Sequence, residues 1–294
     1  MTTACIPRIL AGAALFGVLS LGGCWWSNNS TTLTLALADT PVDGAQSVVI
    51  TFTGVQVQGA SGAPIEYDFA APQAIDLLQL QDDNFAFLLD GADIPAGHYQ
   101  WIRMMVDMSQ SSITLADGGV HPLVIPSGDQ TGLKLVSGFS IASDEQAVFS
   151  VDFDLRRSIT LASGTYDFMP AMRLVDDSTA GSIEGFMSPT LKIGGVSIAD
   201  PACQPAAYIY SGLNVTPVDI NSTSAVQPYQ TADVFLDPVS GNFHYGSDYI
   251  PPGNYTVALV CAAGDDPSTA DTLSFTAPKN AAVAAYSLTE VDFP

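Results

Sequence analysis

The sequence predicts an all-β protein in which two β-sandwich domains follow an N-terminal signal segment. Hydrophobic residues recur at every second position, turn residues separate these runs at short intervals, and no long run has the 3.6-residue period of an amphipathic helix. Hydrophobic residues make up 47% of the chain, a content that indicates a folded protein despite its acidity. The 294 residues are enough for two domains, each with its own core.

Three segments show the two-residue alternation most clearly. They are TLTLALAD (32–39), SVVITFTGVQVQ (47–58) and AVFSVDFDL (147–155). In the second segment the phase changes after Gly54, so we expect a β-bulge there. In the third, hydrophobic residues face one side of the strand, and Asp152 and Asp154 face the other. The exception is the segment 74–89, which we expect to contain a short helix or turn.

A short pattern occurs three times: an aliphatic residue, two residues, Gly, one residue and Tyr. The copies are IPAGHY (94–99), LASGTY (161–166) and IPPGNY (250–255). We expect each glycine to supply the backbone freedom of a tight turn. Tyr99, Tyr166 and Tyr255 would then begin strands, each with its ring over the end of the core and its hydroxyl bonded to nearby backbone, as in a tyrosine corner. Such turns are typical of immunoglobulin-like and transthyretin-like sandwiches, so they indicate fold and not function.

The N-terminus has the features of an export signal. Arg8 precedes an apolar run from Ile9 to Leu21, which is too short to span a bilayer and fits the hydrophobic region of a signal peptide. The run ends in LGGC (21–24), which resembles the lipobox of bacterial lipoproteins. The resemblance implies cleavage before Cys24 and lipid attachment to it; the alternative is an ordinary secretory signal with a chance cysteine.

This interpretation sets the expected location of the protein. Residues 1–23 would be removed as a lipoprotein signal peptide, and residues 24–30 would form a lipidated tether. The protein would then be held on a membrane of the bacterial cell envelope through its N-terminal lipid, at the outer membrane if the organism is Gram-negative.

Two cysteines remain after this processing. Of the four in the chain, Cys5 leaves with the signal and Cys24 carries lipid. In an exported chain the remaining pair, Cys203 and Cys261, predicts one disulfide; the alternative is two isolated buried thiols. The chain has no CxxC motif and no Cys/His cluster, so we expect no zinc site.

The charge of the chain excludes nucleic acids as partners. It carries 30 acidic and 8 basic residues, a formal net charge of −22, and such a surface repels nucleic acids and anionic lipid. We interpret the acidic residues as a solvated surface concentrated at turns. The alternative is structural calcium at the acid pairs, but none of them follows the EF-hand pattern. We expect no metal and no cofactor. The acid pairs are Asp82–Asp83, Asp176–Asp177 and Asp265–Asp266, with Asp39 and Asp43 at a further turn.

A domain boundary is expected in VDDSTAGS (175–182), which separates residues 31–176 from residues 181–294. Before it, an ordered series of motifs resembles family 4382 of the domains of unknown function. The series includes IPAGHYQWIRMMV (94–106), HPLVIPSGDQTGLKL (121–135), VDFDLRRSI (151–159) and YDFMPAMRLV (166–175). This resemblance implies an exported β-sandwich of bacterial lipoproteins, with no established activity or site to transfer.

The second domain is similar to another family. GSIEGFM (181–187), followed by GNFHYGSDYIPPGNYTVALV (241–260), resembles a carboxypeptidase-regulatory or transthyretin-like domain. The intervening segment 200–230 is long and weakly patterned. We interpret it as an elaborated loop that is braced by the Cys203–Cys261 bridge.

No catalytic constellation is evident in the sequence. His98, His121 and His244 lie in different segments, and the chain has no GxSxG motif, HExxH motif or phosphate-binding glycine loop. The sequence therefore favours a non-enzymatic, lipid-anchored envelope module for binding, adhesion or scaffolding, whose partner is an unknown envelope protein or glycan. The alternative is an envelope enzyme that acts on polysaccharide through carboxylates; a pocket with two converging acids and aromatic platforms would favour it.

Overall fold

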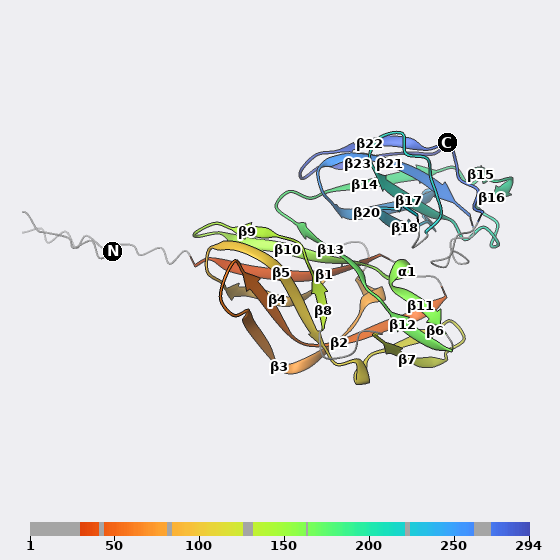
Figure 1. Ribbon diagram of the computed structural model, residues 1–294. Coiled ribbons are helices and arrows are strands. Elements are labelled where there is room, and N and C mark those ends of the chain that lie inside the picture. The colour runs from red at the N-terminus through yellow and green to blue at the C-terminus, as the bar shows by residue number, and fades with distance from the viewer. Residues whose placement is uncertain are drawn as a thin grey trace, which may run out of the picture.

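The protein is built almost entirely from β-strands. The computed structural model describes residues 30–40, 44–80, 84–125, 132–162, 164–220, 224–261 and 272–294. Within these ranges helical structure is limited to η1 (Leu77–Gln79), η2 (Met108–Gln110) and α1 (Leu155–Ser158). The predicted all-β class is confirmed, and η1 is the short helical turn expected within 74–89 (Figure 1).

None of the helices in the described ranges is long and apolar enough to cross a membrane.

The strands before residue 177, which we call the N-terminal unit, form two sheets around one core. The smaller sheet has the order β13-β10-β1-β4. Its strands are β1 (Thr32–Thr40), β4 (Ala86–Asp93), β10 (Gln146–Asp154) and β13 (Ala171–Asp176), and β1 pairs with β10 in parallel. The larger sheet runs β11-β12-β7-β6-β2-β5-β8, with β3 paired to β2 and β9 paired to β5.

The strands of the larger sheet vary widely in length. They are β2 (Ala45–Gly59), β3 (Ile65–Asp76), β5 (Gly97–Val106), β6 (Ser112–Leu115), β7 (Val120–Val124), β8 (Leu133–Leu135), β9 (Phe139–Ile141), β11 (Ile159–Ala162) and β12 (Thr165–Phe168). The alternating residues of both sheets point into the shared core, as the two-residue period requires. Among them are Leu33, Leu35, Leu37, Val48, Ile50 and Phe52, all fully buried.

The bulge predicted at Gly54 is confirmed. The register of β2 shifts between Phe52 and Gly54 against both β3 and β5. Phe52 and Val55 are both fully buried although three positions separate them, because the extra residue returns the strand to the same face. A Cβ on Gly54 would lie 2.8 Å from the carbonyl oxygen of Tyr67, so this position requires glycine.

The described strands after residue 180, which we call the C-terminal unit, form two four-stranded sheets and a hairpin. The sheet orders are β19-β20-β14-β23 and β18-β17-β21-β22, and β15 pairs with β16. The strands are β14 (Gly181–Met187), β15 (Lys192–Ile193), β16 (Val196–Ser197), β17 (Ala206–Ser211), β18 (Gln230–Asp233), β19 (Phe235–Leu236), β20 (Phe243–Ile250), β21 (Gly253–Val260), β22 (Lys279–Val283) and β23 (Leu288–Glu290).

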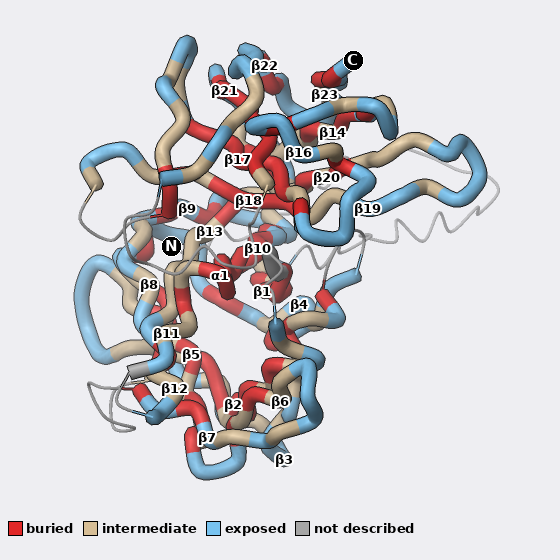
Figure 2. The backbone as a smooth tube through the Cα atoms, turned by 90° about the vertical axis from the view of Figure 1, so that its right-hand side faces the viewer, coloured by how far each residue is buried: buried red, intermediate tan, exposed pale blue. Residues whose placement is uncertain are grey.

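The buried hydrophobic residues form separate clusters in the two units. Among the residues that the structure describes, one cluster lies between residues 33 and 168, and two lie between residues 183 and 293. Figure 2 shows buried segments in both units, with β10 and α1 placed between them. The boundary expected at 175–182 falls between the clusters, and two independently folding domains remain a prediction.

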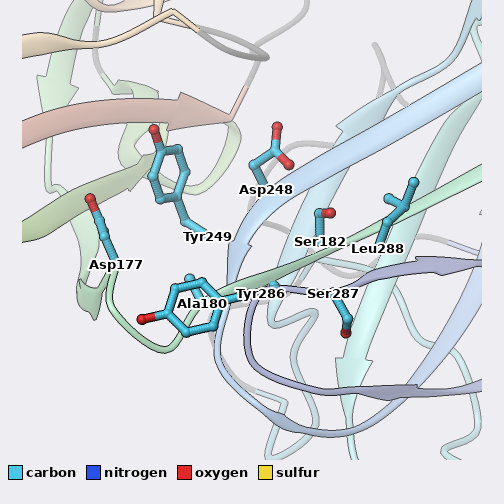
Figure 3. A pocket seen from close by; sticks show the side chains of 9 residues that line it. Asp177, Ala180, Ser182, Asp248, Tyr249, Tyr286, Ser287 and Leu288 are labelled. Carbon is cyan, nitrogen blue, oxygen red and sulfur yellow. The ribbon is translucent and has the colours of Figure 1, made fainter.

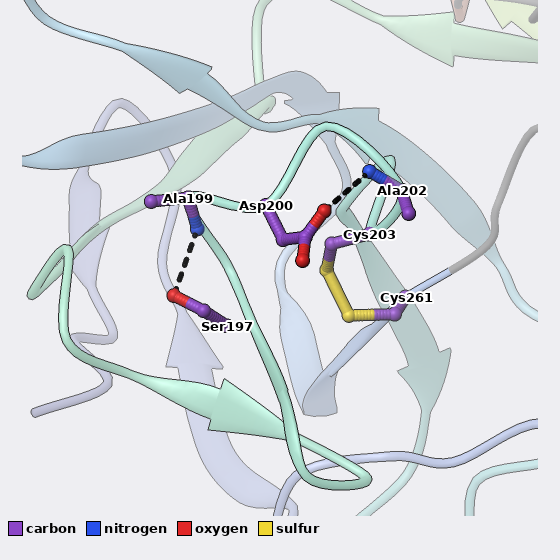
Figure 4. The surroundings of a disulfide bond; sticks show 6 residues. All are labelled: Ser197, Ala199, Asp200, Ala202, Cys203 and Cys261. Atoms are coloured by element: carbon purple, nitrogen blue, oxygen red, sulfur yellow. Dashed lines mark hydrogen bonds between the residues drawn. A yellow bond between two sulfur atoms is a disulfide. The ribbon is translucent and has the colours of Figure 1, made fainter.

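The predicted disulfide between Cys203 and Cys261 is confirmed, with their Cα atoms 4.5 Å apart (Figure 4). It closes the end of a strand pair, because Ala206 of β17 lies opposite Val260 of β21. A turn at Asp200 brings Cys203 into place: the amide of Cys203 donates to the carbonyl oxygen of Asp200 at 2.8 Å.

The interpretation of residues 200–230 as a loop was partly wrong, because this segment contains β17, an inner strand of its sheet. Residues 206–210 are buried on both faces of that strand. A strand buried on both faces has no polar alternation to recognise.

The three patterned tyrosines lie near strand starts in the structure. Tyr99 and Tyr255 are the third residues of β5 and β21, and Tyr166 is the second residue of β12. The hydroxyl of Tyr255 donates to the carbonyl oxygen of Pro251 at 2.8 Å, and that of Tyr99 donates to the carbonyl oxygen of Pro95. The half-buried Tyr166 instead places its ring 5.1 Å from the ring of His121.

The role expected of the glycines holds at one of the three turns. Gly164 has a φ of 86°, a left-handed conformation that favours glycine. The same expectation was wrong for Gly97 and Gly253, which begin β5 and β21 without a left-handed φ. At Gly253 the small size of glycine matters and not its backbone freedom, because a Cβ there would lie 3.3 Å from the ring of Tyr255.

The second face of β10, which carries Asp152 and Asp154, is buried as well. They are 1% and 2% exposed, because the C-terminal unit covers this face of β10. Asp152 pairs with Arg173, and Arg157 lies 4.0 Å from Asp154. Burial raises the pKa of Asp154, and the neighbouring arginines oppose that rise.

Arginines of the N-terminal unit connect it to the C-terminal unit. Nη2 of the buried Arg156 lies 3.3 Å from Oδ1 of Asp233. Arg173 donates to the carbonyl oxygen of Tyr229, and its guanidinium lies 4.2 Å from the centre of the Tyr229 ring. Arg156, Arg157 and Arg173 are three of the eight basic residues in the chain. The few positive charges are thus concentrated beside buried carboxylates, whose charge they compensate.

Candidate functional site

A pocket of about 430 Å³ opens where the link between the two units meets one end of the β19-β20-β14-β23 sheet (Figure 3). Its volume falls within the range of small-molecule sites. Aromatic, hydroxyl and carboxylate side chains line it together. They include Asp177, Ser182, Asp248, Tyr249, Tyr286 and Ser287.

Backbone hydrogen bonds hold the wall of the pocket in place. The turn between β22 and β23 carries Tyr286, whose amide donates to the carbonyl oxygen of Ala180 at 2.8 Å. On the neighbouring strand, the amide of Ser182 donates to the carbonyl oxygen of Ser287 at 2.9 Å. The pocket is therefore fixed by the pairing of β14 with its neighbours and is preformed.

Two tyrosines of the pocket have unusual backbone conformations. The φ angles are 56° for Tyr249 and 55° for Tyr286. A left-handed φ is uncommon for a bulky residue and costs about 1–3 kcal/mol, a strain that proteins tend to retain at functional sites. Tyr286 is also 76% exposed, so burial of its ring does not offset that cost. These two observations make the pocket the candidate functional site.

The charge in the pocket is negative and partly desolvated. Burial raises the pKa of Asp177 to about 6, although the hydroxyl of Ser150 donates to its Oδ2 at 2.9 Å and opposes the rise. Its Oδ1 is buried and has no hydrogen-bond partner among the residues that the structure describes. Asp177 is therefore able to take up a proton under mildly acidic conditions.

Replacing Asp177 by asparagine is expected to remove part of the pH dependence of stability between about pH 4 and pH 6. The folded-state pKa is raised from the ordinary value of 3.8 to about 6, so the folded state binds the proton more tightly than the unfolded state. The contribution of Asp177 to the free energy of unfolding should therefore fall as pH rises through this window, and the difference between wild type and Asp177→Asn isolates it. Urea unfolding of both proteins from pH 3.5 to pH 7 measures it. Asp90→Asn, an exposed substitution, is the control, and parallel curves for wild type and Asp177→Asn would contradict the assignment.

The residues singled out in the sequence mostly lie away from this pocket. Tyr99, Tyr166 and Tyr255 do not line it, and neither does the Cys203–Cys261 bridge. Cys24 lies outside the described residues, as do the acid pairs at 82–83 and 265–266 and Asp43. Within the described part of the chain, no group of three or more His, Cys, Asp or Glu residues is arranged to hold a metal ion.

The three histidines have separate surroundings. Nδ1 of His98 lies 3.2 Å from the hydroxyl of Ser140, His121 packs against Tyr166, and Nε2 of His244 lies 3.5 Å from Oε2 of Glu184. They do not form a common site.

Sequence reasoning missed most of the pocket. In the sequence Asp177 stands out only as half of an acid pair, and Tyr249 and Tyr286 stand outside the repeated Gly–x–Tyr pattern. The pairing of β14 with β20 and β23 joins segments that are distant in sequence. No local sequence pattern predicts this pairing.

Comparison with known families agrees with the motifs of the N-terminal unit. Residues 30–170 match the model of a family described as Domain of unknown function (DUF4382). The resemblance of residues 31–176 to this family is confirmed, and the transthyretin-like resemblance of residues 181–294 stays a prediction. The DUF4382 match ends one residue before β13, so the pocket, which begins at Asp177, lies outside it. No curated protein matches the chain.

Three solved structures from Bacteroides align with much of the chain at low similarity. One is a proposed polysaccharide-binding protein of Bacteroides thetaiotaomicron, with 10% identity, 79% of this chain and 77% of that chain covered, and a TM-score of 0.19. The second is a proposed cell adhesion protein of Bacteroides fragilis, with 5% identity, coverage of 89% and 92%, and a TM-score of 0.22. The third is a proposed cell adhesion protein of Bacteroides eggerthii, with 10% identity, coverage of 90% and 87%, and a TM-score of 0.20. TM-scores of this size carry no weight for the function of this chain.

Proposed function

We propose that this protein is a non-enzymatic, lipid-anchored module of the bacterial cell envelope, and that its pocket binds a sugar unit of a glycan. One observation carries the proposal: the rings of Tyr249 and Tyr286 stand on left-handed backbone in a preformed pocket that also presents carboxylates and hydroxyls. A sugar has an apolar face of C–H groups and a rim of hydroxyls. Aromatic rings cover the former, and the polar groups accept and donate hydrogen bonds to the latter.

The charge of the pocket narrows the ligand further. Asp177 and Asp248 both line it, and the whole chain has a net charge of −22. Uronic acid, sulfate or phosphate groups would be repelled by these carboxylates. The ligand that fits is a glycan without anionic groups.

The geometry supports binding better than hydrolysis. A glycosidase needs two carboxyl groups that face the scissile bond from opposite sides at about 5–9.5 Å. In Figure 3, the Tyr249 ring lies between Asp177 and Asp248. The carboxyl group of Asp177 is already engaged, because its Oδ2 accepts from the hydroxyl of Ser150 and its Oδ1 is buried. Two acids and two aromatic rings line the pocket, but an acid whose carboxyl group is buried and bonded to Ser150 is poorly placed to act on a glycosidic bond.

Replacing Tyr286 by glycine is expected to separate stability from binding. Glycine relieves the left-handed strain at this exposed position, so the free energy of unfolding should stay the same or rise. Binding of glycan should weaken at least tenfold, because the ring that covers the sugar is lost. Tyr286→Phe keeps the ring and should retain most of the affinity. Calorimetry with soluble cello-, malto-, xylo- and chito-oligosaccharides measures the affinity.

The matched control is Phe85→Ala, which removes an aromatic ring that is 48% exposed and does not line the pocket. Its affinity for glycan should equal that of the wild type. Failure of all four oligosaccharide series to bind, or equal affinities for Tyr286→Gly and wild type, would refute the sugar site. Release of shorter sugars on prolonged incubation would support the enzymatic alternative instead.

Replacing Cys24 by alanine is expected to move the protein out of the membrane fraction. The supporting evidence is the LGGC motif after a short hydrophobic run, and an acyl chain contributes about 0.8 kcal/mol per buried methylene to membrane binding. Fractionation of cells that express wild type and Cys24→Ala measures the change. A variant that loses its signal peptide and still sediments with membranes would contradict lipid anchoring.

A further inference from the structure

The outer face of β14 continues beyond the pocket. Ile183 and Met187 of this strand point into the core, so Ser182, Glu184 and Phe186 point outward. Ser182 lines the pocket. Phe186 lies four residues further along the same face, about 13 Å away at the rise of a β-strand.

An aromatic platform occupies the far end of this face. Phe186 lies opposite His244 of β20, which in turn lies opposite Phe235 of β19. The ring centroids of Phe186 and His244 are 4.7 Å apart, and those of Phe235 and His244 are 5.1 Å apart. Phe186 is 37% exposed and Phe235 46% exposed, so three adjacent rings form a surface that solvent reaches.

The middle of the face combines a glycine, which leaves open space, with acidic side chains. Glu184 lies opposite Gly246 on one side and Glu290 on the other. Gly246 has no side chain, and a Cβ there would have no neighbour closer than 3.7 Å. Between the pocket and the platform, the face therefore offers carboxylate acceptors beside the side-chain-free surface of Gly246.

We infer that the ligand is a linear glycan of at least three sugar units, which lies along the outer face of β14 from the Tyr286 pocket to the Phe186–His244–Phe235 platform. This inference rests on the proposed sugar site and extends it. One unit occupies the pocket, one crosses the surface between Glu184 and Glu290, and one stacks on the platform. The carboxylates accept hydroxyl hydrogen bonds and repel anionic chains.

The test measures affinity for sugars of different length and for variants of the aromatic platform. The probes are monosaccharides and the tri- to hexasaccharides of the cello, malto, xylo and chito series, with oligogalacturonate as the anionic probe. Affinity should rise at least tenfold from monosaccharide to trisaccharide or longer in the series that binds. Phe186→Leu and Phe235→Leu keep an apolar side chain in place of each ring. They should reduce hexasaccharide affinity at least fivefold and leave monosaccharide affinity within twofold.

The outcomes distinguish this inference from the proposal on which it depends. If Tyr286→Gly loses binding but the platform variants and ligand length have no effect, the pocket stands and the extended face is refuted. If no series binds, or Tyr286→Gly binds normally, the sugar site itself is refuted. Oligogalacturonate binding as tight as that of the neutral hexasaccharides would overturn the charge argument. Thermal unfolding of each variant verifies that it is folded, and Val239→Ala, at a position that is 93% exposed, is the surface control.

Discussion

Replacing Arg173 by alanine is expected to lower the free energy of unfolding by about 3–5 kcal/mol, because it leaves a buried carboxylate without its partner. The Asp152 side chain is 1% exposed and pairs with Arg173. The substitution also removes the hydrogen bond to the carbonyl oxygen of Tyr229 and the contact with its ring. The C-terminal unit should therefore loosen from the N-terminal unit as stability falls.

Two further variants isolate the cause. The double variant Asp152→Leu with Arg173→Met removes both charges, and it should recover most of the lost stability since well-packed apolar groups replace a buried ion pair at little cost. Arg157→Ala, whose side chain is 29% exposed and 4.0 Å from Asp154, should change stability by about 1 kcal/mol or less. Denaturant unfolding gives the free energies, and limited proteolysis at residues 177–181 reports the loosening. Equal stabilities for Arg173→Ala and Arg157→Ala would show that the buried pair is not what holds this interface.

Removing the disulfide with Cys203→Ser and Cys261→Ser is expected to cost about 4 kcal/mol by the chain-entropy relation. The bridge spans a sequence separation of 58 residues and closes the loop that contains β17 to β21. Cys203 is fully buried, so the serine hydroxyl adds a further cost if it lacks a partner. The loss should fall mainly on the C-terminal unit.

Thermal unfolding followed by circular dichroism, with and without a reductant, measures this loss. The double serine variant should melt well below the oxidised wild type, and reductant should lower the melting temperature of the wild type but not that of the variant. A variant that melts with the oxidised wild type would mean that strand pairing alone holds β17 against β21.

Much of the fold could be predicted from the sequence because its information is local. A two-residue period needs only neighbouring positions, so the alternation of β1 predicted its buried leucines. The change of phase at Gly54 predicted the bulge for the same reason. The disulfide followed from the count of cysteines left after processing, and its Cα separation agrees.

Only the tertiary structure decided which polar residues are buried and which residues meet at a site. Asp152 and Asp154 alternate with apolar residues as surface residues do, but the C-terminal unit covers them and arginines compensate their charge. The pocket and the aromatic platform depend on the order β19-β20-β14-β23, which brings Tyr249 near Tyr286 and Phe186 beside His244. Strand order and domain packing are set by long-range burial, and a linear pattern specifies the face of a strand without specifying what lies against it.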